Sequence, residues 1–292
     1  MTSEVLHPLP RSRSVVGEQF RAVGMALRYE WILFFLGLAF LSLIFMLNEI
    51  REGRNPDLRS AFSLTAGISI PIALLGLFAP MSVWKSEGPD RRGYHWAMPV
   101  RRTRHTLAKS FAGWGWLMLL VAIVLLWGAL TARATGGGVG VWSERVASPG
   151  QGGAMQAYRL IQHEMATWQW LVPFTAVTIS YLVGSIIVLA SDHPWIWLAG
   201  ITVGIFILGS TLAAAGLEDV LAYIHTLIIG HYGLWGAISG TRQIVSEVVL
   251  NDRTFTSSTG VPDLSSWLAS TAIWMTAAAA GFLWAANRHP ED

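Results

Sequence analysis

Apolar runs about as long as a bilayer is thick recur along the chain, and they constrain its fold more than any other feature. Six of them lie at residues 31–47, 62–83, 111–130, 170–190, 195–215 and 267–286. A hydrocarbon core about 30 Å thick needs roughly 20 mostly apolar residues of helix. An isolated strand cannot satisfy its backbone hydrogen bonds there. The runs therefore predict an all-α membrane protein with six transmembrane helices.

The composition agrees with this prediction and excludes several kinds of chemistry. Charged residues make up 13% of the chain and hydrophobic residues 53%, whereas soluble domains carry about 25% charged residues. The chain has no cysteine. This absence excludes disulfides, thiolate metal sites, cysteine nucleophiles and iron–sulfur clusters.

The distribution of Lys and Arg predicts the orientation in the membrane. With the N-terminus in the cytoplasm, twelve of the twenty Lys and Arg residues fall on the cytoplasmic side and eight outside. Cytoplasmic loops carry the excess of positive charge. Six spans then return the C-terminus to the cytoplasm. We expect one polytopic domain over residues 1–292, in the cell (inner) membrane.

Four segments outside the runs have their own character. Residues 14–29 are amphipathic, which favours a helix lying in the membrane interface; a cytoplasmic extension of the first span is the alternative. Residues 131–167 and 216–266 are predicted to be external, and residues 154–166 could form a short helix. Within the second external segment, residues 217–235 are apolar but interrupted by Glu218, Asp219, His225 and His231. This piece is re-entrant, interfacial or a seventh span.

The sequence contains no motif for nucleotide, zinc or haem chemistry. It lacks the glycine-rich phosphate loop G-x-x-x-x-G-K-[ST]. His163 and Glu164 begin a zinc-protease motif, but the second histidine is replaced by Thr167. No histidine lies in the middle of a predicted span, where a haem would need one. Glu30 and Asp192 lie at span ends, and Glu30 suggests a capping or pairing residue. We expect no catalytic, metal or cofactor site and no enzymatic activity in the chain itself.

The remaining feature is a basic loop, residues 85–109, between the second and third predicted spans. Its sequence is KSEGPDRRGYHWAMPVRRTRHTLAK. It holds seven of the twenty cations: Lys85, Arg91, Arg92, Arg101, Arg102, Arg104 and Lys109. Charge alone could serve only to fix the topology. Residues 91–98 could form a short helix that ends at Pro99.

The order of residues in the basic loop resembles the signature of ABC-2 type permeases. Glu87-Gly88 comes first, Met98-Pro99-Val100-Arg101-Arg102 follows, and Leu107-Ala108-Lys109-Ser110 leads into the third span. The six-span layout and the long segment before the last span are similar too. The chain departs from the family pattern at His95-Trp96, which stands where an aliphatic pair is usual, and in its long external glycine-rich insert.

The resemblance implies both a fold and a function. It implies a cytoplasmic coupling helix in the basic loop, an interfacial N-terminal helix and an external re-entrant segment before the last span. The ABC-type ATPase subunit would be a separate chain. The implied coupling residues are Glu87, Gly88, Arg91, Arg92, Pro99, Arg101, Arg102 and Lys109.

The expected function is therefore that of the transmembrane permease subunit of an ABC transporter, with export of a lipid, glycan, peptide or drug-like molecule. Expected partners are the ATPase, a second permease copy or paralogue and membrane lipids, and an extracytoplasmic partner could bind the external insert; no nucleic acid is expected. The alternative is a non-transporting membrane anchor subunit of a redox or other membrane complex.

Overall fold

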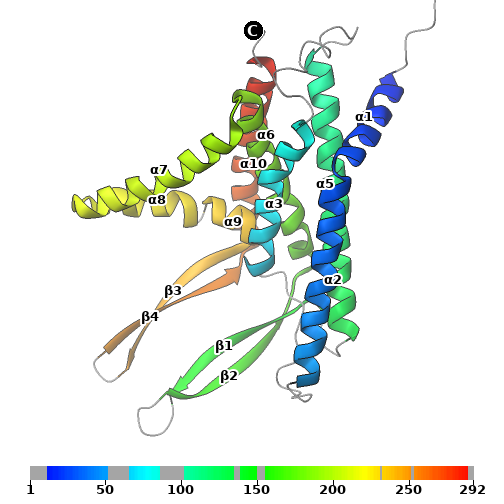
Figure 1. Cartoon of the computed structure of the whole chain (residues 1–292). Helices are drawn as coiled ribbons and strands as arrows, with labels where there is room; N and C mark the ends of the chain where they lie inside the picture. Colours follow the sequence, from blue (N-terminus) through cyan, green and yellow to red (C-terminus); the bar gives the residue numbers. More distant parts are fainter. Residues whose placement is uncertain are drawn as a thin grey trace, which may run out of the picture.

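The computed structural model describes residues 12–51, 66–85, 102–134, 139–149, 155–230, 232–250 and 253–288. Most of this part of the chain is helical (Figure 1). The helices are α1 Ser12–Ala26, α2 Arg28–Arg51, α3 Ala66–Trp84, α5 Arg102–Ala134, η2 Thr167–Leu171, α6 Val172–Ala190, α7 Pro194–Ala214, α8 Glu218–Ile229, α9 Leu234–Ser239 and α10 Leu264–Arg288. The strands are β1 Val141–Pro149, β2 Met155–Glu164, β3 Thr241–Leu250 and β4 Arg253–Pro262.

Each of the six apolar runs falls on helix over the residues that the structure describes. Four helices are long and apolar enough to cross a membrane, namely Thr103–Ala134, Thr167–Ala190, Pro194–Leu212 and Leu264–Asn287. A fifth span results if the bent pair formed by α1 and α2 counts as one, whereas the apolar part of α3, Ser69–Trp84, is shorter. Long apolar helices of this kind are typical of a multi-pass membrane protein. The six-span layout stays a prediction.

The predicted amphipathic segment at residues 14–29 is helical over most of its length. α1 ends at Ala26 and α2 begins at Arg28, with a bend of 57° between them. The helical hydrogen-bond pattern continues across the bend, because Leu27 N–H donates to the Val23 carbonyl and Trp31 N–H to the Leu27 carbonyl. α1 is therefore continuous with α2, and its place in the membrane interface stays a prediction.

Small residues bring the bundle helices close together. α3 and α6 form the most extensive helix pair in the described part of the chain. A Cβ atom at Gly76 of α3 would lie 2.7 Å from the Val177 carbonyl oxygen of α6, and one at Gly184 of α6 would meet the Leu77 carbonyl of α3. Helices in membranes pack tightly where such small residues face each other. The core between α3, α5, α6 and α10 includes Val83 and Phe282.

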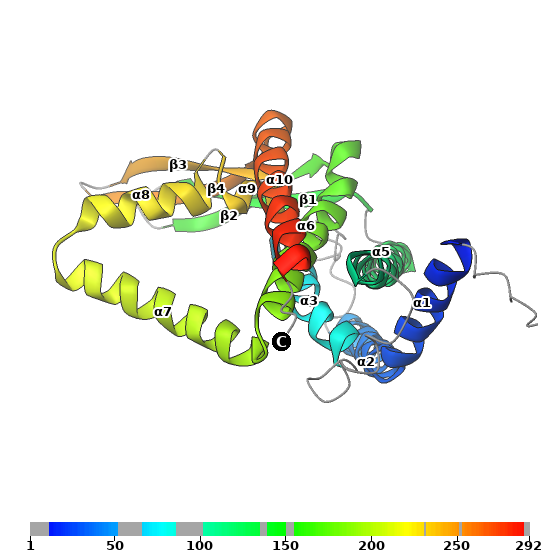
Figure 2. The same cartoon turned by 90° about the horizontal axis from the view of Figure 1, so that it is seen from above.

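α7 and α8 leave this bundle as a projecting arm, residues 194–229 (Figures 1 and 2). None of the described side chains in the apolar window of α7 is buried. Near the beginning of α7, the Trp195 ring stacks on the Phe78 ring of α3, with centroids 5.7 Å apart. The arm thus exposes apolar surface along its length.

Two β-hairpins show that the expected all-α fold is too narrow. β1 pairs with β2 in antiparallel register, from Val141 opposite Glu164, and β3 pairs with β4 from Thr241 opposite Pro262. The short helix predicted for residues 154–166 is wrong, because β2 occupies Met155–Glu164. The segment finds its hydrogen-bond partners on β1, a non-local pairing that overrides the local helical pattern.

The apolar piece at residues 217–235 is a broken helix. α8 ends at Ile229 and α9 begins at Leu234. The Gly230 N–H closes α8 on the Thr226 carbonyl. With 12 residues, α8 is shorter than the roughly 20 needed to cross a bilayer. A re-entrant path for this segment stays a prediction.

The elements divide between two ends of the bundle. α1 begins, α3 ends, α5 begins and α10 ends at one end, and both hairpins extend from the opposite end (Figure 1). The basic loop therefore connects two helices at the end where α10 finishes.

Candidate functional site

The candidate site is the end of the bundle from which the basic loop emerges. Six of the eight predicted coupling residues lie outside the described residues: Glu87, Gly88, Arg91, Arg92, Pro99 and Arg101. Arg102 is the first residue of α5, and its side chain is also outside the description. Lys109 is described in full. The structure thus describes the end of α3 and the beginning of α5, which flank the undescribed part of the loop.

Lys109 folds back against the end of α3. Its Nζ atom lies 4.7 Å from the ring centroid of Trp84, and only 5% of the residue is exposed. A cation over an aromatic face is attracted by the ring, and more strongly where water is excluded. The contact therefore holds the first part of α5 to the last turn of α3, the two helices that flank residues 86–101 in the chain.

One residue further along, α5 is tied to α6. The Tyr181 hydroxyl of α6 donates a buried hydrogen bond of 2.9 Å to the Ser110 carbonyl of α5. Gly113 provides the space, since a Cβ atom there would meet the Tyr181 hydroxyl and would lie 2.9 Å from a Val83 methyl group. α3, α5 and α6 are therefore joined at one level, close to the end of α3.

α1 packs along the other side of α5. The indole N–H of Trp116 donates to the Phe20 carbonyl at 2.9 Å, and the two rings lie 6.1 Å apart. A Cβ atom at Gly24 would lie 2.7 Å from the Trp116 ring, so the helices are in close contact. The N-terminal helix is thus fixed to the same helix that carries Lys109.

The basic-loop cations whose side chains the structure describes differ in their exposure. Lys85 and Arg104 are exposed, and Lys109 is buried. An exposed cation can form a charge-assisted contact with a partner, whereas a buried one beside an aromatic ring serves the bundle itself. Lys109 thus holds α5 against α3, while Lys85 and Arg104 are accessible from outside the bundle.

Trp84 and Tyr181 were missed as site residues by sequence reasoning. Trp84 is one of several tryptophans near the ends of the apolar runs, and Tyr181 is a polar residue inside one of them. Their partners, Lys109 and Ser110, lie on another helix, so no local pattern joins them. The Trp84-Lys85 pair at the loop's beginning was the one available signal. In comparisons with known proteins, no family model, no curated protein and no solved structure matches this chain.

Proposed function

We propose that the chain is the transmembrane permease subunit of an ABC transporter, powered by a separate ATPase subunit that binds the basic loop. The observation that carries the proposal is the position of Lys109. The resemblance assigns this lysine to the beginning of the third span, and its Nζ atom lies over Trp84 at the end of the second. An ATPase subunit that pushes on the loop would therefore move the end of α3 and the beginning of α5 together.

The contacts of Lys109 and Ser110 would transmit a movement of the ATPase to the rest of the bundle. The Lys109–Trp84 contact joins α5 to α3, and the Ser110–Tyr181 hydrogen bond joins α5 to α6. Closely packed elements move as rigid bodies because their cores are not continuously deformable. Closure of an ATPase dimer would then displace α3, α5 and α6 as a unit. Two such bundles, from two copies or from a paralogue, would form the export pathway between them.

The proposed location is the cell inner membrane, with both termini in the cytoplasm. α1 begins and α10 ends at the end of the bundle that carries the basic loop (Figure 1), and cytoplasmic loops hold the excess of Lys and Arg. The hairpins would then face outward, where an extracytoplasmic partner could bind them. The apolar helices suit a lipid, lipid-linked glycan, peptide or drug-like substrate.

Co-purification tests the proposal. The tagged chain, extracted from its native membrane, should recover a P-loop ATPase identified by mass spectrometry. Deletion of residues 91–98 should abolish this recovery, whereas deletion of residues 150–154, between β1 and β2 at the opposite end, should leave it intact. Recovery that is unchanged by the first deletion would refute the proposal. Recovery of redox subunits with no ATPase would instead identify a membrane anchor subunit.

A further inference from the structure

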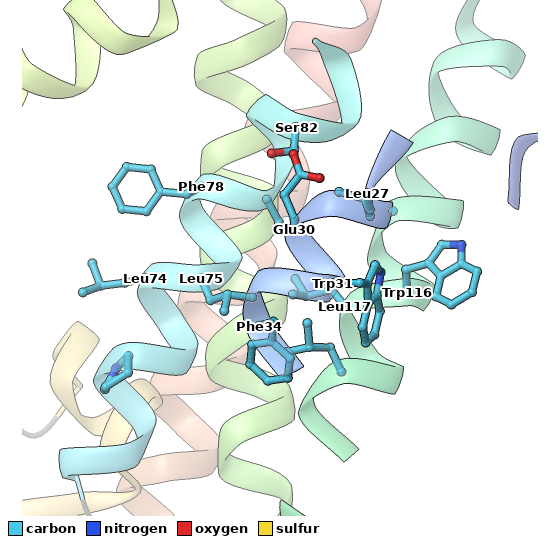
Figure 3. Close-up of a pocket in the computed structure, with 14 residues that line it drawn as sticks. Leu27, Glu30, Trp31, Phe34, Leu74, Leu75, Phe78, Ser82, Trp116 and Leu117 are labelled. Atoms are coloured by element: carbon cyan, nitrogen blue, oxygen red, sulfur yellow. The ribbon is translucent and has the colours of Figure 1, made fainter. Parts of the chain in front are cut away.

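A pocket of about 400 Å³ lies between α2, α3 and α5 (Figure 3). Aliphatic and aromatic side chains make most of its wall, among them Trp31, Phe34, Leu75 and Leu117. Pockets for small organic molecules are typically of this size and are mostly apolar, with a few polar groups that orient the ligand. Two polar side chains, Glu30 and Ser82, line this one. They point toward one another at one end (Figure 3).

One oxygen of the half-buried Glu30 side chain lacks a hydrogen-bond partner. Its Oε2 atom is buried and has no hydrogen-bond partner among the residues that the structure describes. A buried carboxyl oxygen without a donor is costly, because it has lost water and gained nothing in exchange. The sequence suggested that Glu30 caps a helix or pairs with a cation. A donor from outside the described residues, or a ligand, would satisfy it.

The nearest cation in sequence is occupied elsewhere. The Arg28 guanidinium donates to the Tyr29 hydroxyl at 2.7 Å and lies 4.5 Å from the Tyr29 ring centroid. Both residues are exposed. Arg28 therefore turns toward the surface, away from the pocket that Glu30 lines.

The pocket's aromatic rings suit a cation as well as an apolar body. Trp31 lies edge-on to Trp116, with centroids 5.6 Å apart, and stacks on Phe35 at 5.7 Å. Aromatic faces attract organic cations and bury apolar groups at the same time. A carboxyl group at one end of such a wall sets the direction in which a charged ligand would lie.

We propose that this pocket binds a small apolar molecule carrying one protonated amine. The ammonium group donates to Glu30 Oε2, and the apolar body lies between Trp31, Leu75 and Leu117. Charge complementarity argues for this occupant over a neutral lipid chain, which would leave Glu30 unpaired. The site belongs to a single chain and does not depend on an ATPase, so it stands or falls separately from the proposed function.

A matched pair of fluorescent probes tests the proposal on the purified full chain in lipid nanodiscs. Dansylcadaverine joins an apolar fluorophore to a primary amine through an alkyl chain, and its N-acetyl derivative lacks the charge. Energy transfer from the fifteen tryptophans of the chain to dansyl reports binding, and the variants described next locate the site. The amine should bind the wild type about tenfold more tightly than the acetylated probe, as expected for a hydrogen bond to a charged group. Equal affinity, or binding of neither probe, would overturn the proposal.

Two pairs of variants locate the effect. Glu30→Gln should remove the preference for the amine, whereas Glu18→Gln, on the exposed side of α1, should retain it. Ala79→Phe should weaken binding of both probes by filling the pocket, and Ala122→Phe, exposed on α5, should not. Size-exclusion chromatography and circular dichroism confirm that each variant is folded. A preference that survives in Glu30→Gln, or affinities that Ala79→Phe leaves unchanged, would contradict the assignment.

Discussion

α6 and α7 follow one another in the chain and are both apolar enough to cross a membrane, yet they pack very differently. In the most apolar window of each helix, 44% of the residues are buried for α6 and none for α7. Apolar character therefore decides which segments enter the membrane, and it does not decide which helices pack together. Packing follows from small residues and buried hydrogen bonds, which α6 has at Gly184 and Tyr181.

The glycines of the two helices show the difference most sharply. A Cβ atom at Gly184 would meet the α3 backbone, while one at Gly200 or Gly204 of α7 would meet nothing within 4 Å. Glycine thus allows two helices to approach closely in the bundle, whereas in the projecting arm it faces no neighbour. Matched substitutions in the two helices should therefore affect stability unequally.

The largest difference is expected for leucine at these two glycines. Gly184→Leu must push α3 and α6 apart, which should cost about 3 kcal/mol or more because well-packed cores do not accommodate added volume. The unfolding midpoint, followed by tryptophan fluorescence in detergent, should fall or the folded fraction should vanish. Gly200→Leu should leave the midpoint within a few degrees of wild type. Equal losses would show that α7 is packed as tightly as α6.

A smaller difference is expected for tryptophans. Trp84→Leu leaves a cavity and deprives Lys109 of its aromatic face, which should lower stability by about 2–3 kcal/mol. Trp197→Leu on exposed α7 is the control and should change little. A double-mutant cycle with Lys109→Met isolates the contact, since residues that interact directly give non-additive effects. Additive losses would mean that Lys109 and Trp84 do not stabilise each other.

The smallest difference is expected for two tyrosines. Tyr181→Phe removes the hydrogen bond to the Ser110 carbonyl, worth about 1 kcal/mol for a typical buried pair. Tyr223→Phe removes a hydroxyl from exposed α8 and should leave the unfolding midpoint unchanged. If Tyr181→Phe is also neutral, the link between α5 and α6 depends on packing alone.

The sequence predicted the features that depend on local composition. A helix at each apolar run and a helix before the first one follow from the length and periodicity of hydrophobic residues. The hairpins were missed because Met155–Glu164 forms a strand only by pairing with β1. The Lys109–Trp84 contact and the Glu30 pocket each join different helices, and a single segment carries no signal of such a meeting. The sequence also could not predict that α7 packs against few other helices, because α7 is as apolar as α6.

ATP hydrolysis retained by the purified complex tests most directly whether an ATPase binds the basic loop, as we propose. The double charge reversal Arg91→Glu with Arg92→Glu changes the loop. The matched pair Arg242→Glu with Arg253→Glu changes β3 and β4 at the opposite end. We predict that hydrolysis co-purifying with the wild-type chain falls to background in the loop variant and persists in the hairpin variant. Equal hydrolysis in both variants, or none with the wild type, would contradict the account.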